Sequence, residues 1–172
     1  THLKAEIHRE GKVFVQEYSK GAPLYPVKVL GEASDTGTII TFKPDGEIFT
    51  ASTTYNYDIL ATRLRELAYL NKGIKLTIKD IRDEATELNE NGEVVSTEKY
   101  EVFHSEKGLM EFVSYLDGTR EKLTENPIYL ETDKTGIPIE IAMQYNTGFS
   151  ENIHSYVNNI NTIEGGTHLT GF

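Results

Sequence analysis

The sequence lacks cysteine entirely, has no long apolar run and carries no surplus of positive charge. Without cysteine the chain forms no disulfide bond, no thiolate metal site and no cysteine nucleophile. No apolar run approaches the ~20 residues that a membrane-spanning helix needs, and no charged-then-apolar leader opens the chain. We therefore expect a soluble protein with no membrane contact that is not exported in this form, with the cytoplasm as its compartment.

The charge balance bears on nucleic-acid binding. The 172 residues include 17 Lys and Arg against 27 Asp and Glu, which gives a formal net charge of -10. The basic residues are scattered, whereas a protein that binds DNA or RNA needs a basic face. We expect this chain alone to be no strong DNA binder. The composition is otherwise that of an ordinary globular protein with one large domain or two small ones.

The sequence shows no residue pattern that is typical of a catalytic centre. Its five histidines are far apart, and neither common glycine-rich phosphate-binding motif is present. Paired carboxylates such as Glu131 and Glu140 could meet across a predicted hairpin, but a solvated surface explains them better than a cleft. The stretch EGGTH, residues 164–168, is typical of a tight turn followed by a helix cap at Thr167, and less so of an anion-binding nest. We predict no catalytic residue and no metal ligand in this chain.

Alternating apolar and polar residues predict four strands in the first 45 residues. The first runs from Leu3 to a hairpin turn at Glu10-Gly11, and four successive strands indicate an antiparallel meander. The other three predicted strands are residues 12–18, 26–32 and 37–44.

A helical period then begins at Tyr57 and continues to Asn71, which predicts an amphipathic helix packed on the sheet. Gly73 fits the left-handed stop of this helix, and a strand follows over residues 73–80. The acidic stretch 84–98, around Asn91-Gly92, is interpreted as an exposed hairpin or loop. The predicted apolar stripe of the helix consists of Tyr57, Leu60, Leu64 and Leu67, flanked by Ala61 and Ala68.

A second unit is predicted from Ser105. It begins with a helix that Gly118 ends, and a hairpin over residues 126–146 follows, with Pro138 near the start of its second strand. One more strand is predicted within residues 151–160. Helices and antiparallel strands in this order indicate the α+β class.

Five strings of the sequence resemble, in the same order and at similar spacing, the B subunits of bacterial DNA gyrase, which are type IIA topoisomerase ATPase subunits. The similarity runs from about residue 3 to residue 172, apart from the acidic stretch. The paralogous B subunits of topoisomerase IV are the nearest competitor, and a non-catalytic α+β interaction module remains the alternative from a different class. The five strings are residues 9–21, 36–49, 63–74, 140–146 and 158–172.

The resemblance implies a fold and a division into domains. Residues 1–104 would form the distal, C-terminal part of a Bergerat-type (GHKL) ATPase domain, an antiparallel sheet with a packed helix. Residues 105–172 would form the first part of a truncated transducer domain of ribosomal-S5-like fold, with the opening turn of a further helix at Thr167. The catalytic glutamate, the magnesium ligand, the adenine-reading aspartate and the lysine loop of the family match no residue here. The chain by itself is therefore expected to be inactive.

Part of the wall of a nucleotide pocket is also implied by the resemblance. The family's TGT strand entry matches Thr36-Gly37-Thr38, so Gly37 and Thr38 are expected to border the nucleotide, with the Thr38 hydroxyl at the adenine edge. Ile40 would line the adenine slot. Arg9 matches an arginine at the pocket mouth that also contacts aminocoumarin inhibitors in the family. Without the resemblance, Thr38 is an ordinary strand threonine and Arg9 an ordinary hairpin arginine.

The whole protein is expected to work as members of this family do. It would use ATP and Mg²⁺, dimerise on binding ATP, and join the gyrase A subunit in an A2B2 assembly. It would pass one DNA duplex through a break in another and so introduce negative supercoils. Double-stranded DNA is then a partner of the whole assembly.

Overall fold

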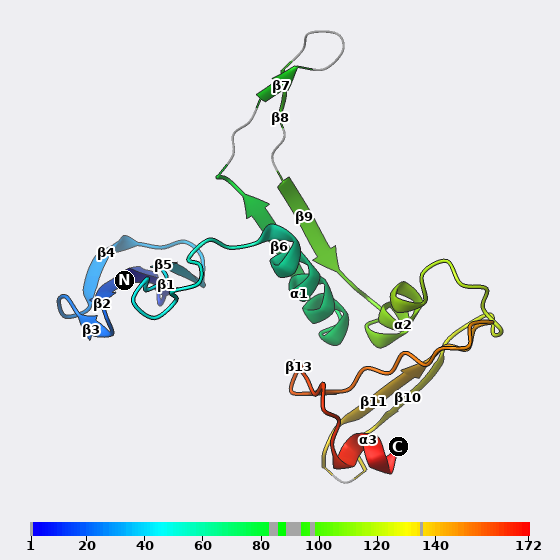
Figure 1. Ribbon diagram of the computed structural model, residues 1–172. Coiled ribbons are helices and arrows are strands. Elements are labelled where there is room, and N and C mark those ends of the chain that lie inside the picture. Colours follow the sequence, from blue (N-terminus) through cyan, green and yellow to red (C-terminus); the bar gives the residue numbers. More distant parts are fainter. Residues whose placement is uncertain (1, 83–85, 89–93, 97–98, 135) are drawn as a thin grey trace. The chain divides into compact units, whose positions relative to one another are not determined.

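The computed structural model describes residues 2–82, 86–88, 94–96, 99–134 and 136–172 (Figure 1). The chain forms two compact units, Thr1–Tyr55 and Asn56–Phe172. Antiparallel strands dominate both units, and the predicted α+β class is confirmed. None of the helices in the described ranges is long and apolar enough to cross a membrane.

The first unit is a five-stranded antiparallel sheet built on a hairpin of β1 and β2. The hairpin turn lies at Glu10 and Gly11, whose φ angles of 54° and 73° are those of the turn that matches the twist of the two strands. The strands of this sheet are β1 (His2–Arg9), β2 (Lys12–Ser19), β3 (Ala22–Pro23), β4 (Lys28–Glu32) and β5 (Gly37–Lys43).

The predicted meander is wrong, although the strands themselves lie where the alternation places them. A meander would pair β5 with β4, whereas β4 pairs with β2 and β5 pairs with β1, on the other side of the hairpin. The short β3, which also pairs with β2, was not predicted. Alternation determines which face of a sheet a residue takes, but not which free edge of a hairpin a later strand joins.

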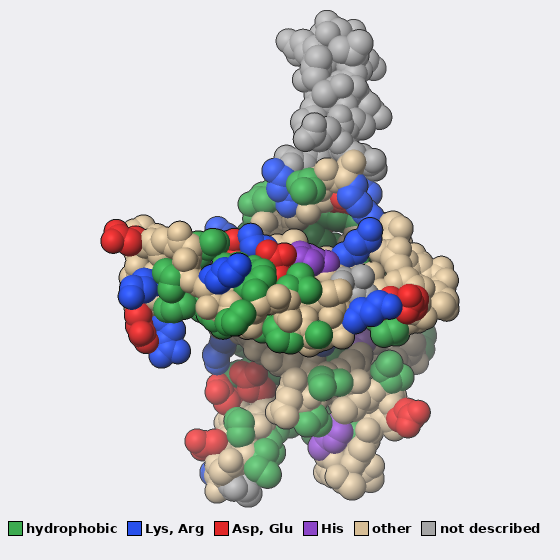
Figure 2. All heavy atoms as spheres, turned by 90° about the vertical axis from the view of Figure 1, so that its left-hand side faces the viewer, with side chains coloured by type: hydrophobic (Ala, Val, Ile, Leu, Met, Phe, Trp, Pro, Cys, Tyr) green, Lys and Arg blue, Asp and Glu red, His purple; other side chains and the backbone are tan. Residues whose placement is uncertain are grey.

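The first unit buries little apolar surface. Within its described residues Val15, at 3% exposure, is the only buried hydrophobic side chain. Figure 2 shows green side chains on the surface of this unit, among blue and red ones. A large exposed apolar area on a single sheet is typical of a surface that another part of a protein covers. The exposed apolar residues include Ile7, Val29, Leu30, Ile39, Ile40 and Phe42.

The second unit begins with helix α1 (Tyr57–Leu70), which packs on a pair of antiparallel strands, β6 (Lys75–Asp80) and β9 (Lys99–His104). The Asn56 side chain caps the helix by accepting a hydrogen bond from the Ile59 amide at 3.1 Å. Gly73, with a φ of 86°, takes the left-handed conformation that was predicted beyond its end. The helix–sheet core consists of Tyr57, Ala61, Ala68 and Phe103, with Leu64, Leu76 and Ile78 around it.

The apolar stripe of α1 is rotated from its predicted position. Ala61 and Ala68, predicted to flank the stripe, are 4% and 2% exposed and lie at its centre, whereas Leu60 is 39% exposed. Small side chains allow the helix backbone to approach the sheet closely, so the alanines take the contact and Leu60 turns away. A pattern based on hydrophobicity alone ranks leucine above alanine and misses this.

Strands β7 (Thr86–Leu88) and β8 (Val94–Ser96) pair with each other and confirm a hairpin within the acidic stretch. Its predicted turn at Asn91-Gly92 lies outside the described residues.

Helix α2 (Leu109–Asp117) ends at Gly118, as predicted, and the predicted hairpin is formed by β10 (Ile128–Thr132) and β11 (Ile139–Met143). Pro138 directly precedes β11, where it removes no ladder hydrogen bond.

The single strand predicted within residues 151–160 is wrong. The structure has a tight hairpin of β12 (Tyr156–Val157) and β13 (Ile160–Asn161). Its turn lies at Asn158 and Asn159, whose φ angles are 50° and 65°. Asparagine tolerates the left-handed region better than most residues, and two such residues in sequence make a hairpin turn of the same type as that at Glu10-Gly11.

The last element is the short helix α3 (Thr167–Gly171). A helix start at this point was predicted, but with Thr167 as its cap. Gly166 occupies the cap position instead, and its carbonyl accepts hydrogen bonds from the amides of Leu169 and Thr170. Thr167 is the first helical residue and its side chain makes no capping bond.

Candidate functional site

Strands β1 and β5 bring two of the four predicted site residues onto one face of the first unit. Thr38 lies opposite Ile7 and Ile40 lies opposite Ala5 in the antiparallel ladder. Side chains two residues apart on a strand point to the same face, so Thr38 and Ile40 lie side by side with those two partners. Both are exposed, Ile40 by 51%. The result is an apolar strip with one hydroxyl group at its end.

Arg9 is the last residue of β1 and lies two residues after Ile7, which pairs with Thr38. Its side chain therefore lies on the same face of the sheet as that of Thr38. Its side chain is 74% exposed and its Nε donates to Glu10 at 3.1 Å. Gly37 begins β5 opposite His8, with open space where a side chain would be. The ladder thus places Arg9, Gly37 and Thr38 at one end of the β1–β5 pair and Ile40 near its middle.

An open cavity of about 460 Å³ adjoins this strip. Leu3 and Ala5 of β1 and Tyr18 of β2 lie on the face that carries Ile40, since Leu3 pairs with Tyr18 and Ala5 pairs with Ile40. Sequence reasoning missed Tyr18 and Lys20 as neighbours of the site, although the alternation of β2 contains the information for Tyr18. The cavity is lined by Leu3, Ala5, Tyr18, Lys20 and Gly21.

Charged groups near the β1–β5 pair form ion pairs with one another in several places. Lys20 Nζ lies 2.9 Å from a carboxylate oxygen of Glu47. Next to Gly37, the ring of His8 is hydrogen-bonded to Asp35 at 2.7 Å, and this bond holds the pKa of the Asp35 carboxyl below its usual range. Sequence reasoning missed the His8–Asp35 pair. His8 lies on β1 and Asp35 in the loop before β5, and the sequence does not predict that β1 and β5 pair.

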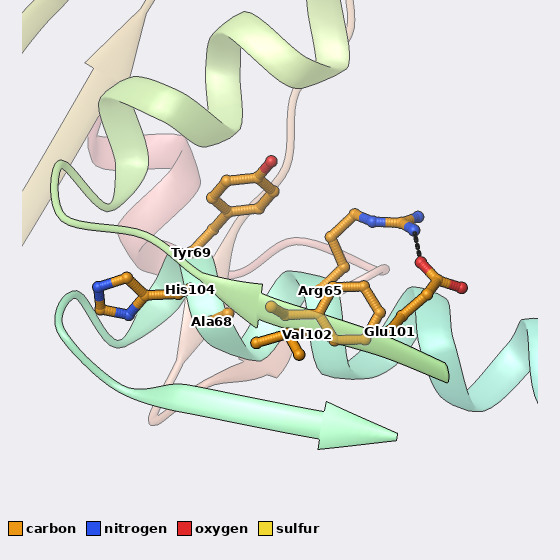
Figure 3. Close-up of a pocket in the computed structure, with 7 residues that line it drawn as sticks. Arg65, Ala68, Tyr69, Glu101, Val102 and His104 are labelled. Atoms are coloured by element: carbon orange, nitrogen blue, oxygen red, sulfur yellow. Dashed lines mark hydrogen bonds and ion pairs between the residues drawn. The ribbon is translucent and has the colours of Figure 1, made fainter. Parts of the chain in front are cut away.

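A second cavity, of about 270 Å³, lies between α1 and β9 in the other unit (Figure 3). Its one guanidinium group, that of Arg65, donates to Glu101 at 3.0 Å and to the Tyr115 hydroxyl at 3.2 Å. The charge of Arg65 is therefore matched within the protein, which makes this cavity a poor site for an anion. The residues that line it are Arg65, Ala68, Tyr69, Glu101, Val102, Phe103 and His104.

The strip has the character of a contact surface, since its residues are apolar apart from one hydroxyl and one guanidinium. A flat apolar surface with a hydroxyl at one end and a guanidinium near its edge suits a planar heterocycle with a polar edge. No group of three His, Cys, Asp or Glu side chains that could hold a metal ion occurs in the described part of the chain. The strip is therefore a candidate for one wall of a binding site.

Comparison with known proteins identifies a long collinear relationship. A family model described as DNA gyrase B matches residues 108–172. The DNA gyrase B protein of Cytophaga hutchinsonii is 54% identical over all 172 residues, which cover 34% of that protein. That of Halalkalibacterium halodurans is 51% identical over 172 residues, which cover 25% of it. The chain thus spans about a third or less of the length of these relatives.

A solved structure agrees with the sequence comparison. The 43K ATPase domain of Thermus thermophilus gyrase B, crystallised with an aminocoumarin, matches 98% of this chain and 43% of its own. The TM-score is 0.82 and the sequence identity is 33%.

Proposed function

The chain belongs to the DNA gyrase B family and corresponds to one part of such a protein, and from this premise we propose that the whole protein is the ATP-hydrolysing subunit of a type IIA DNA topoisomerase. The observation that carries the proposal is the identity of 54% along the entire chain, without interruption between its two units. Relatives at this identity share their fold and the chemistry that the fold positions. Neither a topoisomerase IV subunit nor an unrelated interaction module is favoured.

The proposed domain division places residues 1–104 in the ATPase domain and residues 105–172 in the transducer domain. The match of the family model from residue 108 onwards is consistent with a boundary near this position. The chain has no catalytic base of its own in this proposal, so hydrolysis requires residues outside it.

The strip on β1 and β5 is proposed as one wall of the ATP pocket. The Thr38 hydroxyl would hydrogen-bond the adenine edge, Ile40 would contact the ring, and Arg9 would lie at the mouth. The residues fit this role because the surface is apolar, open and bordered by a donor and acceptor group. They do not fit Mg²⁺, since no ligand set is found in the described residues, and the ion would be held elsewhere in the protein.

The proposal extends to partners and compartment. The whole protein would act with a gyrase A subunit on double-stranded DNA, in an A2B2 assembly whose two gyrase B chains dimerise on binding ATP, and it would work in the cytoplasm. The net charge of -10 indicates that the strong DNA contacts lie outside this chain.

A supercoiling assay tests the proposal. The protein expressed from its whole gene, mixed with the gyrase A protein of the same organism, is expected to introduce negative supercoils into relaxed plasmid only when ATP and Mg²⁺ are present. The 172-residue chain alone, at the same concentration, is expected to show no ATP turnover above background. ATP-dependent decatenation without supercoiling would instead assign the protein to the topoisomerase IV group.

A further inference from the structure

Two carboxylates face each other directly on the β10–β11 hairpin. Glu131 pairs with Glu140 in the antiparallel ladder, and like charges at such a position destabilise a hairpin. The Tyr129 hydroxyl lies between them, 2.9 Å from Glu131 Oε2 and 2.6 Å from Glu140 Oε1. The carboxylates hold the pKa of the Tyr129 phenol well above its usual range, Glu140 having the larger effect. A hydroxyl has only one proton to donate, so the pair also needs a cation.

Lys72 supplies that cation from a distant part of the sequence. Its Nζ lies 3.5 Å from Glu131 Oε2 and 3.6 Å from Glu140 Oε1, so one ammonium group serves both carboxylates. Lys72 follows the cap residue Asn71 of helix α1, which places it just beyond the end of the helix. The pKa of Glu131 is lowered, first by the Tyr129 hydroxyl and then by Lys72.

The path of the Lys72 side chain is shaped by a glycine. A Cβ atom at Gly108, the residue before α2, would lie 3.3 Å from Lys72 Cβ and 3.8 Å from its Cδ. Gly108 also has a φ of 57°, which side-chain-bearing residues rarely adopt. The absence of a side chain at Gly108 therefore lets the lysine stem lie against the start of α2 on its way to the hairpin.

The hairpin is otherwise held by packing on a different helix. Strand β11 packs against α2, and α2 packs against α1 through the stacked rings of Tyr69 and Phe112, 5.2 Å apart. Among the residues that the structure describes, the charge of Lys72 connects the end of α1 to the hairpin itself. Its side chain is 52% exposed, and those of Glu131 and Glu140 are 56% and 32% exposed, so dissolved salt screens the link.

We propose that Lys72, Glu131, Glu140 and Tyr129 form an electrostatic clasp that fastens the β10–β11 hairpin to the end of α1 and releases it when the charge is removed or screened. Release leaves the packing on α2 in place, so the hairpin becomes more mobile while the unit stays folded. The inference stands on these contacts and is independent of the proposed function.

Hydrogen exchange of the protein expressed from its whole gene tests the clasp. In Lys72→Gln at low salt, the amides of β10 and β11 are expected to exchange roughly two- to fivefold faster, as the loss of exposed ion pairs implies. Raising the salt to 1 M should produce a similar increase in the wild type and none in the variant. The matched control is Lys75→Gln, which removes an exposed lysine of β6 and should leave the hairpin unchanged.

A cycle separates the clasp from general destabilisation. The double variant Glu131→Gln/Glu140→Gln removes both negative charges and their repulsion, and adding Lys72→Gln to it should have no further effect on hairpin exchange. Unchanged exchange in Lys72→Gln would overturn the proposal. An equal increase at all amides of α1, α2 and the hairpin would also overturn it, because it would mean that Lys72 stabilises the unit as a whole.

Discussion

The His8 ring on β1 is hydrogen-bonded to the Asp35 carboxylate, which lies in the loop leading into β5, and this ties the loop to the strand beside it. The bond favours the ionised form of Asp35 and lowers its pKa. A carboxyl whose pKa is depressed on folding contributes stability that is fully present above its unfolded pKa and is lost as the pH falls through the depressed value.

We expect His8→Ala to raise the pKa of Asp35 toward its ordinary value of ~3.9. A carbon-detected NMR titration of the Asp35 carboxyl measures the change. The difference in stability between the variant and the wild type should shrink as the pH falls through the acid range, since both then have a protonated Asp35. An Asp35 pKa that does not respond to the substitution would show that the hydrogen bond does not form in solution.

Thr38→Val is expected to weaken nucleotide binding without changing the fold. Valine keeps the branched shape that suits a strand but removes the hydroxyl, and the loss of one neutral hydrogen bond corresponds to ~1 kcal/mol, or about a fivefold increase in Kd. Calorimetry on the whole protein measures this. Thr41→Val, on the opposite face of the same strand, is the matched control and should leave Kd unchanged. Equal effects of the two variants would rule out a direct role of Thr38.

The rotated apolar stripe of α1 predicts that a substitution at Ala68 destabilises the protein more than one at Leu60. The sequence pattern alone predicts the opposite order. Ala68→Leu adds volume where the helix meets the sheet and is expected to destabilise the protein by roughly 1–3 kcal/mol. Leu60→Ala removes a partly exposed side chain. It should lower the free energy of unfolding by less than ~2 kcal/mol, which is the smallest loss typical of Leu→Ala at a buried position. Urea denaturation of both variants gives the comparison. The opposite ranking would mean that Leu60 is part of the core.

Asp117 is 7% exposed at the end of α2, and its Oδ2 atom has no hydrogen-bond partner among the described residues. Its Oδ1 accepts a hydrogen bond from the Asn146 amide. Asp117→Asn keeps that acceptor and removes a buried negative charge from a helix C-terminus, so a gain of ~1 kcal/mol is expected.

Asp117→Leu is the contrasting change, because it leaves the Asn146 amide without its acceptor and should destabilise the protein by about 1–3 kcal/mol. Thermal unfolding of both variants distinguishes the two effects. If both substitutions are equally harmful, the charge of Asp117 has a favourable partner that the geometry does not reveal.

The sequence predicted the positions of most strands and helices because those depend on local periodicity. Strand β1 alternates over eight residues, and α1 has a capping asparagine and a clear helical period. Local periodicity does not predict which strands pair. Strand β5 pairs with the free edge of β1 and not with β4, and the alternation within β5 does not specify that edge. The same limit explains Leu60, whose orientation depends on how closely two alanines let the helix approach.

The candidate site was predictable to a similar degree. The spacing of Thr38 and Ile40 on one strand places both on one face, and Arg9 reaches the same face only because β1 pairs with β5. The cavity next to them also depends on Tyr18, which the sequence separates from Ile40 by 22 residues. Pairings over such distances, like that of Lys72 with Glu131, follow from tertiary structure and have no local pattern.

The dependence of Lys72 on Gly108 has an evolutionary consequence. A lysine at position 72 has its ion pairs only while the hairpin keeps its acidic residues, and a side chain at position 108 would crowd its stem, with 3.3 Å between the two Cβ atoms. These four positions should therefore change as a set in related proteins: a neutral residue at 72 is expected together with the loss of at least one of the two facing acids. An alignment of many relatives would reveal this as correlated substitution, while Lys75 should vary independently.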